Sequence, residues 1–260
     1  MTGFAVPISA SATTTERDDF HDEHLRDEQA AAELAGLRLL ARRAGDELDS
    51  APAAEILSWA VEHFGADWCV ASSMADAVLI HLASQALPGV DVVFLDTGYH
   101  FAETIGMRDA VDAVLPVTMR TVLPLRTVRE QDAQLGPRLH ERAPGACCAI
   151  RKVEPLRRAL APYKAWASGL RRADSASRAR TRVVAWDAKH DMVKLNPIAA
   201  WSDEDVQAYI DEHGLLVNPL LSDGYGSIGC APCTRRLLPG EDSRAGRWAG
   251  TPKTECGLHR

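Results

Sequence analysis

Two pairs of cysteines place the strongest constraint on this chain. Cys147 and Cys148 are adjacent, and Cys230 and Cys233 follow much later with two residues between them. Thiols in a reducing compartment are more often metal ligands or reactive groups than disulfide partners. We therefore expect the fold to bring these two distant segments together at one site.

The length and composition fit a cytoplasmic enzyme with a full hydrophobic core. The chain has 260 residues, of which 46% are hydrophobic, enough for one large α/β domain. It contains no apolar run of the roughly 20 residues that span a bilayer, and its N-terminus lacks the pattern of a secretory signal. We therefore expect a cytoplasmic protein with no membrane partner.

Charge is distributed unevenly along the chain. The formal net charge of -7 argues against a general nucleic-acid binder. Acidic residues are concentrated in residues 1–64, whereas residues 146–182 are strongly basic. The basic stretch is either an ordinary solvated face or a pocket for a small polyanion.

Strand-like and helix-like segments alternate through most of the chain. Short apolar runs predict strands at residues 68–71, 90–95, 117–122, 165–169, 183–186 and 192–195. Helix patterns separate most of these runs, including one that begins at the cap residue Ser202. This alternation predicts an α/β fold with a doubly wound, mainly parallel sheet.

The chain is expected to contain three regions. Residues 1–25 are poor in large apolar groups and predict a disordered N-terminal tail. Residues 26–248 would form a single α/β domain, and residues 249–260 a mobile C-terminal tail. From Asn218 onward the sequence is rich in glycine and proline, which predicts a loop-rich segment. A metal centre could supply the order that such a segment lacks.

Polar loops follow two of the expected strands. Ser72 and Ser73 precede a helix, and residues 95–98 end the next strand as Leu-Asp-Thr-Gly. A strand, a polar loop and a helix together point backbone N–H groups at an anion, and parallel sheets bind ligands at their carboxyl edge. The alternatives are a plain helix cap and a tight turn.

The spacing leaves three interpretations of the paired cysteines. Adjacent residues have Cα atoms about 3.8 Å apart, so Cys147 and Cys148 could chelate one zinc ion only with backbone strain. In an iron–sulfur cubane, neighbouring thiolates can each bind a different iron. A redox-active vicinal disulfide would leave Cys230 and Cys233 unexplained. All three stay open on spacing alone, and the cluster fits the spacing best.

The other two cysteines differ in their surroundings. Cys256 lies near the C-terminus, between Glu255 and Gly257 and close to His259. An accessible thiol near a cationic surface has a lowered pKa and can act as a nucleophile. The alternative is an inert terminal cysteine. Cys69 lies in an expected buried strand and is predicted to serve packing alone.

Together these motifs resemble the sulfonucleotide reductase family, specifically its iron–sulfur branch of bacterial assimilatory adenosine 5′-phosphosulfate (APS) reductases. The resemblance covers residues 50–259 and rests on Ser72-Ser73-Met74-Ala75-Asp76, Leu95-Asp96-Thr97-Gly98, Cys147-Cys148 with Arg151-Lys152, Gly169-Leu170-Arg171-Arg172, Tyr225 to Cys233, Arg244-Ala245-Gly246-Arg247-Trp248, and Glu255-Cys256-Gly257-Leu258-His259. Ala75 and Gly226 stand where many relatives carry other residues, and neither position bears a charge or sulfur that the chemistry needs.

The resemblance implies an enzyme that reduces APS to sulfite and AMP in sulfate assimilation. Cys147, Cys148, Cys230 and Cys233 would hold a 4Fe-4S cluster, and Cys256 would take up the sulfonate as an S-sulfocysteine. Thioredoxin or a similar dithiol would then release sulfite. The implied substrate-binding residues are Ser72, Ser73, Leu95, Asp96, Thr97, Gly98, Arg171, Arg172, Arg244, Arg247 and His259.

Lys152 is implied to lie between the cluster and the substrate, where its charge would offset the thiolates. We count it with Cys256 as catalytic.

The implied fold is adenine-nucleotide α-hydrolase-like, and the possibility of a homo-oligomer stays open. Two alternative functions also stay open: reduction of the 3′-phosphorylated substrate (PAPS), and a non-enzymatic iron–sulfur redox module.

Overall fold

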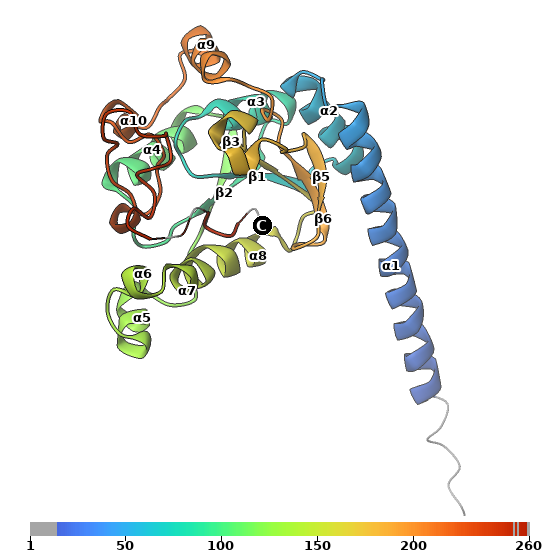
Figure 1. The fold of residues 1–260 in the computed structure, drawn as a ribbon. Coiled ribbons are helices and arrows are strands. Elements are labelled where there is room, and N and C mark those ends of the chain that lie inside the picture. Colours follow the sequence, from blue (N-terminus) through green and yellow to red (C-terminus); the bar gives the residue numbers. More distant parts are fainter. Residues whose placement is uncertain (1–14, 252, 254, 259–260) are drawn as a thin grey trace, which may run out of the picture.

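A six-stranded sheet forms the centre of the molecule (Figure 1). The computed structural model describes residues 15–251, 253 and 255–258. The strands are β1 (Trp68–Ser72), β2 (Val90–Leu95), β3 (Val117–Val122), β4 (Ala165–Ser168), β5 (Val184–Asp187) and β6 (Met192–Leu195), in the order β3-β2-β1-β4-β6-β5. Neighbours are parallel except for the antiparallel pair of β5 and β6. The predicted mainly parallel α/β sheet is confirmed.

Helices connect most of the strands. They are α1 (Thr15–Glu47), α2 (Ala53–Phe64), α3 (Val78–Ala86), α4 (Ala102–Val114), α5 (Val128–Leu135), α6 (Leu139–Arg142), α7 (Pro144–Cys148), α8 (Glu154–Leu160), α9 (Asp203–His213) and α10 (Pro219–Ser222). The predicted cap of α9 is confirmed, since the Ser202 hydroxyl accepts a hydrogen bond from the Asp205 N–H at 3.1 Å. Within the described residues, no helix has the length and hydrophobicity needed to cross a bilayer.

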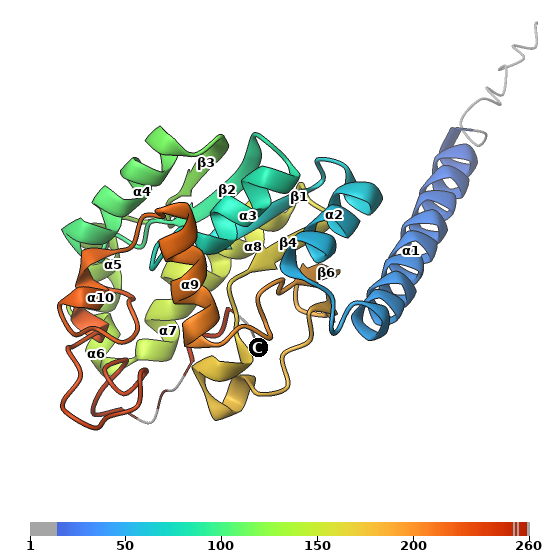
Figure 2. The same ribbon diagram turned by 90° about the horizontal axis from the view of Figure 1, so that it is seen from above.

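Side chains of the central strands alternate between two hydrophobic layers. On one face, Val70 and Phe94 belong to the larger core, which α2, α3 and α4 cover. On the opposite face, Cys69 and Trp166 belong to a smaller core together with Leu156 and Leu160 of α8. Helix α8 runs along this face of the sheet (Figures 1 and 2). Cys69 is fully buried, as expected for a packing residue. The sheet is therefore covered by helices on both faces, as a parallel sheet requires.

The strand order creates a switch point between β1 and β4. From β1 the chain continues to β2 and β3 on one side, whereas from β4 it continues to β5 and β6 on the other. Open α/β sheets bind ligands outside the carboxyl ends of the strands at such a point. The loops after β1 and β4 therefore frame the expected ligand position.

The helix that carries the first cysteine pair differs from the prediction. We expected one regular helix over residues 150–160, but residues 149–153 form a wider π-helical turn between α7 and α8. Pro155 has no N–H to donate to the carbonyl of Arg151 four residues earlier, so a regular α-helix could not continue its hydrogen-bond ladder here. The wide turn lies directly before this proline.

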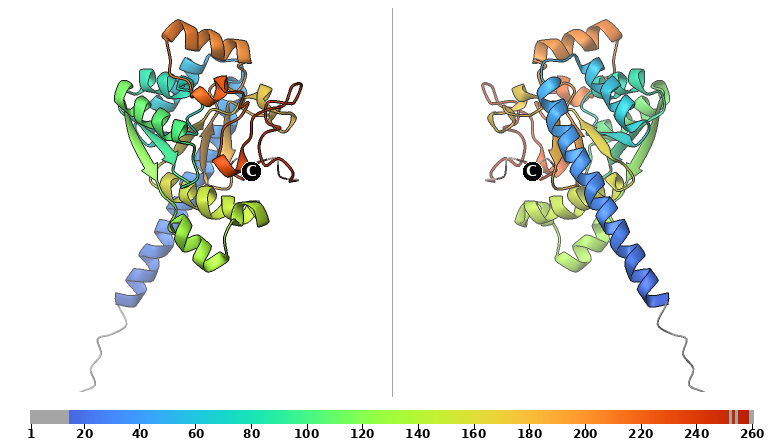
Figure 3. Two further views of the ribbon diagram at one scale, coloured as in Figure 1. Left: turned by 90° about the vertical axis from the view of Figure 1, so that its left-hand side faces the viewer. Right: turned by 90° about the vertical axis from the view of Figure 1, so that its right-hand side faces the viewer.

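Helix α1 begins earlier than the sequence suggested. Residues 15–25, expected to belong to a disordered tail, form its first turns. The chain contains no glycine or proline from Thr15 to Ala35, which allows a helix to form there. Residues 1–14 lie outside the described residues, so the division into three regions stays a prediction. The N-terminal part of α1 stands away from the sheet (Figure 3), and its C-terminal part packs on β5.

We predict that Gly45→Ala weakens the packing of α1 on β5. A Cβ atom at Gly45 would lie 2.4 Å from the backbone oxygen of Val184, so the helix would have to move away from the strand. We expect a loss of about 1–3 kcal/mol in the free energy of unfolding, measured by urea denaturation. Gly36→Ala in the same helix is the control, because a Cβ atom there meets nothing within 4 Å. It should leave stability unchanged or raise it by about 0.5–1 kcal/mol, and equal effects of the two variants would contradict the prediction.

Candidate active site

The two cysteine pairs lie around one cavity. Cys147 and Cys148 end helix α7, and Cys230 and Cys233 flank a short 3₁₀ turn. All four thiols line the cavity. Backbone hydrogen bonds fix the second pair, because Ala231 N–H donates to the carbonyl of Tyr99 at 2.7 Å. The fold thus brings together the two segments that the sequence analysis expected to meet.

Burial raises the pKa of three of these thiols, Cys147, Cys148 and Cys233. It raises the pKa of Cys147 to about 12, with a further contribution from the neighbouring thiols of Cys148, Cys230 and Cys233. Burial likewise raises the pKa of Cys233 to about 11. A bound metal cation reverses this trend, since it binds thiolates and not thiols. The cavity therefore favours either protonated thiols or thiolates bound to metal.

The arrangement of the thiols bears on the kind of metal centre. Among the described residues, no three His, Cys, Asp or Glu side chains are grouped so that they could hold a metal ion. Four thiols spread around one cavity instead fit a cluster in which each thiolate binds its own iron. Four thiols around one cavity are the donor set that an iron–sulfur cluster requires.

Two basic residues follow the first cysteine pair and have different positions. Lys152 lines the same cavity, and its charge offsets part of the increase that burial causes in the pKa of Cys148. Arg151 is buried. Its Nε donates to the carbonyl of Thr97 and its Nη1 to the side chain of Gln131 at 3.0 Å. Arg151, which the sequence analysis left without a role, thus joins the cysteine segment to the end of β2.

The loop after β2 reaches the cavity through Tyr99, which lines it. Thr97 is fully buried, and its hydroxyl lies 3.3 Å from the sulfur of Cys230. Asp96 accepts a hydrogen bond from the Gly98 N–H at 2.9 Å, which forms a tight turn, and Leu95 ends the strand. The Thr97 hydroxyl therefore faces a cysteine and not an open ligand position, and the expected substrate role of residues 95–98 stays a prediction.

The loop after β1 has an unusual backbone. Met74 has a φ of 60°, a left-handed conformation that residues other than glycine rarely adopt. The Ser72 hydroxyl accepts from the Met74 N–H at 3.1 Å, and the Asn218 side chain donates to the Met74 carbonyl at 3.0 Å. Ser73 is exposed. Hydrogen bonds thus hold the loop in one conformation at the switch point, and Ser73 within the loop is exposed.

The paired arginines after β4 point to different neighbours. Arg171 forms ion pairs with Asp174 at 3.0 Å and Asp203 at 2.7 Å. Arg172 bonds Asp49, beyond the end of α1, at 2.5 Å. Both guanidinium groups are therefore held by carboxylates. The expected substrate role of Arg171 and Arg172 stays a prediction.

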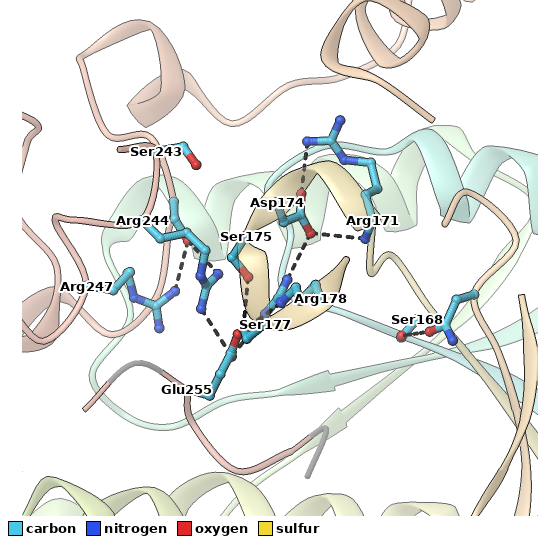
Figure 4. A network of polar contacts seen from close by, with 12 residues as sticks. Ser168, Arg171, Asp174, Ser175, Ser177, Arg178, Ser243, Arg244, Arg247 and Glu255 are labelled. Atoms are coloured by element: carbon cyan, nitrogen blue, oxygen red, sulfur yellow. Dashed lines mark hydrogen bonds and ion pairs between the residues drawn. The ribbon is translucent and has the colours of Figure 1, made fainter. Parts of the chain in front are cut away.

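Arg244 and Arg247 lie in the C-terminal loops and face the tail (Figure 4). Arg244 pairs with Glu255 at 3.2 Å. Arg247 stacks over the ring of Trp248 and donates to the carbonyl of Ile228 at 2.9 Å. Burial lowers the pKa of Arg247, and the charge of Cys256 opposes this shift. Arg244 therefore binds the tail directly, whereas Arg247 lines the cysteine cavity.

Cys256 lies beside several of these cations. In its ionised form, its thiol would raise the pKa of Arg247, Cys148 and Lys194. Lys194 lies in β6, where it is almost completely buried, and its ammonium group is 4.5 Å from the centre of the Trp166 ring. Burial lowers the pKa of Lys194 to about 8. The expected nucleophile thus shares a region with buried cations, while His259 lies outside the described residues.

Sequence reasoning missed Arg178, Glu255 and Lys194. Arg178 lies in the same polar loop as the paired arginines, so the basic composition of that loop was a signal for it. Glu255 stood beside Cys256 in a recognised motif but had no assigned role. Lys194 occurs within an apolar strand run, a pattern that gives no indication of an ionic site.

Comparison with known proteins identifies relatives along most of the chain. Residues 68–236 match the family model described as phosphoadenosine phosphosulfate reductase domain. The chain is 66% identical to the adenosine 5′-phosphosulfate reductase of Streptomyces coelicolor over 223 residues, which cover 86% of this chain and 94% of that one. It is 58% identical to the adenosine 5′-phosphosulfate reductase of Mycolicibacterium smegmatis, with the same coverage.

A solved structure shares the architecture. The crystal structure of a phosphoadenylyl-sulfate reductase from Candida auris, in complex with phosphate, superposes with a TM-score of 0.64 at 27% identity. The match covers 75% of this chain and 96% of that one. It confirms the expected adenine-nucleotide α-hydrolase-like fold. The family model and the close relatives together show that the chain belongs to the phosphoadenosine phosphosulfate (sulfonucleotide) reductase family.

Proposed function

We propose that the protein reduces adenosine 5′-phosphosulfate to sulfite and AMP in sulfate assimilation. The observation that carries this proposal is the position of Cys256, whose thiol lies close enough to the buried Arg247 and Lys194 to raise their pKa when it is ionised; Arg247 also lines the four-thiol cavity. Close relatives named adenosine 5′-phosphosulfate reductase support the choice of substrate. A thiolate must approach an anionic sulfate in this reaction, and fixed cations reduce the repulsion between them.

In the first step, the Cys256 thiolate attacks the sulfate sulfur. A sulfur–sulfur bond forms, the bond from that sulfur to the bridging oxygen breaks, and its electron pair leaves with AMP. The product on the protein is an S-sulfocysteine. Arg244 and Arg247 provide cationic groups in the region where negative charge increases, and Ser72 and Ser73 lie in the loop at the switch point, where the nucleotide phosphate would bind.

In the second step, thioredoxin or a similar dithiol regenerates the thiol. Its thiolate attacks the sulfur of Cys256, and sulfite leaves with the electron pair of the sulfur–sulfur bond. The second thiol of the reductant then closes a disulfide and releases Cys256. Two electrons pass from the dithiol to the sulfonate, so the overall reaction is balanced.

Cys147, Cys148, Cys230 and Cys233 would hold a 4Fe-4S cluster. When bound, the cluster supplies structural order and a fixed electrostatic environment without a net change of its own redox state. Lys152 lines the same cavity, where its ammonium group would offset the negative charge of the thiolates. Within this proposal it orients anions between the cysteines and the nucleotide site.

Substrate choice can be tested directly. The holoenzyme, purified without oxygen, should release sulfite from APS with a kcat/KM at least about tenfold higher than from PAPS, which corresponds to about 1.4 kcal/mol of discrimination. Higher activity on PAPS would identify a reductase for the 3′-phosphorylated substrate. Absence of activity on both would favour a non-enzymatic redox module.

We predict that Cys256→Ser abolishes sulfite release, because a hydroxyl at this position cannot form the S-sulfo intermediate. The visible absorption of the cluster should be unchanged, since Cys256 is not among the four cavity thiols. Wild-type protein incubated with radiolabelled APS should carry a label that dithiols remove, and the variant should carry none. Residual turnover near the wild-type rate would exclude Cys256 as the nucleophile.

We predict that Cys148→Ser loses both the cluster and the order of the C-terminal loops. The two cysteine pairs share one centre, so loss of one ligand should also release the segment around Cys230. The measurements are iron content, visible absorption and the rate of proteolytic cleavage within residues 218–248. Cys69→Ala is the matched control, because Cys69 is buried in the smaller core away from the cavity. A Cys148→Ser variant with full cluster content and activity would refute the prediction.

A further inference from the structure

The residue before Cys256 is anchored to the body of the protein. The Glu255 carboxylate forms two hydrogen bonds with Arg178, from Nε and Nη2, each 3.0 Å long. Arg244 adds a third contact at 3.2 Å (Figure 4). Only 9% of the Glu255 side chain is exposed. A two-pronged arginine–carboxylate contact with so little water is both directional and strong.

The residues after Cys256 are anchored as well. The Lys189 ammonium group donates to the carbonyl of Gly257. The next residue, Leu258, packs against the smaller core that contains Trp166 and Leu156. The short segment of residues 255–258 is thus fixed by charge on one side of Cys256 and by a hydrogen bond and apolar packing on the other.

Arg178 is oriented before it meets the tail. Its Nη1 donates to Asp174 at 2.9 Å, and Asp174 also pairs with Arg171 at 3.0 Å. The Arg178 side chain is 14% exposed. Because its direction is set by a second carboxylate, the guanidinium loses little further freedom when it binds Glu255.

We propose that Glu255 is a positioning residue, whose ion pairs with Arg178 and Arg244 hold the tail so that Cys256 faces the site of sulfate attack. This inference rests on the proposed reductase function. Glu255 does not react with the substrate. It fixes the position of its neighbour, and a nucleophile held near its reaction partner reacts far faster than one on a freely moving chain.

The test compares Glu255→Gln, which keeps the shape and removes the charge, with Glu255→Asp, which keeps the charge. For Glu255→Gln we expect the alkylation rate of Cys256 by iodoacetamide, located by mass spectrometry of the holoenzyme, to rise about tenfold as the tail detaches. The kcat for APS should fall about tenfold, whereas KM should change little. Glu255→Asp should restore part of both effects.

Glu241→Gln is the matched control. Glu241 forms a similar two-pronged pair with Arg235, with both contacts at 2.7 Å, but its partner is 40% exposed. This variant should behave like the wild type in both measurements. Wild-type alkylation and turnover in Glu255→Gln would overturn the proposal, and so would a fall in kcat with an unchanged alkylation rate. If wild-type protein released no sulfite from APS, the proposed function would fail, while the alkylation comparison would still decide whether Glu255 holds the tail.

Discussion

The rest of the site depends on the hydrogen bonds that the buried guanidinium group of Arg151 makes. It bonds the carbonyl of Thr97 and the side chain of Gln131, and it lies 5.2 Å from the centre of the Tyr99 ring. A buried charge costs several kcal/mol unless its donors are satisfied, and the planar guanidinium can serve several partners at once. Arg151 therefore fixes the helix with Cys147 against the end of β2.

Charged groups in and near the cavity reduce the energetic cost of burying one another. Burial alone lowers the pKa of Arg247 and of Lys194, and it raises the pKa of Cys147 and Cys233. Opposite charges placed side by side reduce each of these penalties. If the groups of one charge are removed, the groups of the opposite charge stay buried without a compensating partner. Backbone hydrogen bonds also fix the loops beyond Asn218, for example from Arg235 N–H to the carbonyl of Gly246 at 3.0 Å and from Trp248 N–H to the carbonyl of Cys233 at 2.9 Å.

The sequence predicted the parts of the molecule that local patterns determine. The strands, the Ser202 cap and the meeting of the cysteine pairs follow from periodicity, cap chemistry and ligand spacing. The pair of Arg178 and Glu255 could not be predicted in the same way, because its members are 77 positions apart and no local pattern links them. Lys194 could not be recognised either, because the apolar residues around it in the strand give no sign of its ionic neighbours. The contact of Arg172 with Asp49 could not be predicted either, because the two residues are 123 positions apart.

The wide turn at residues 149–153 determines how an insertion or deletion in this segment would move the cysteine thiols. Leu156 and Leu160 hold α8 against the sheet, while Cys147 and Cys148 lie on the other side of the turn. Each residue of a regular helix rotates the chain by about 100°. Removing one residue from the turn would therefore leave the anchored end in place and rotate both thiols away from the cavity. The length of this stretch is therefore fixed by the distance and angle between two separately anchored ends.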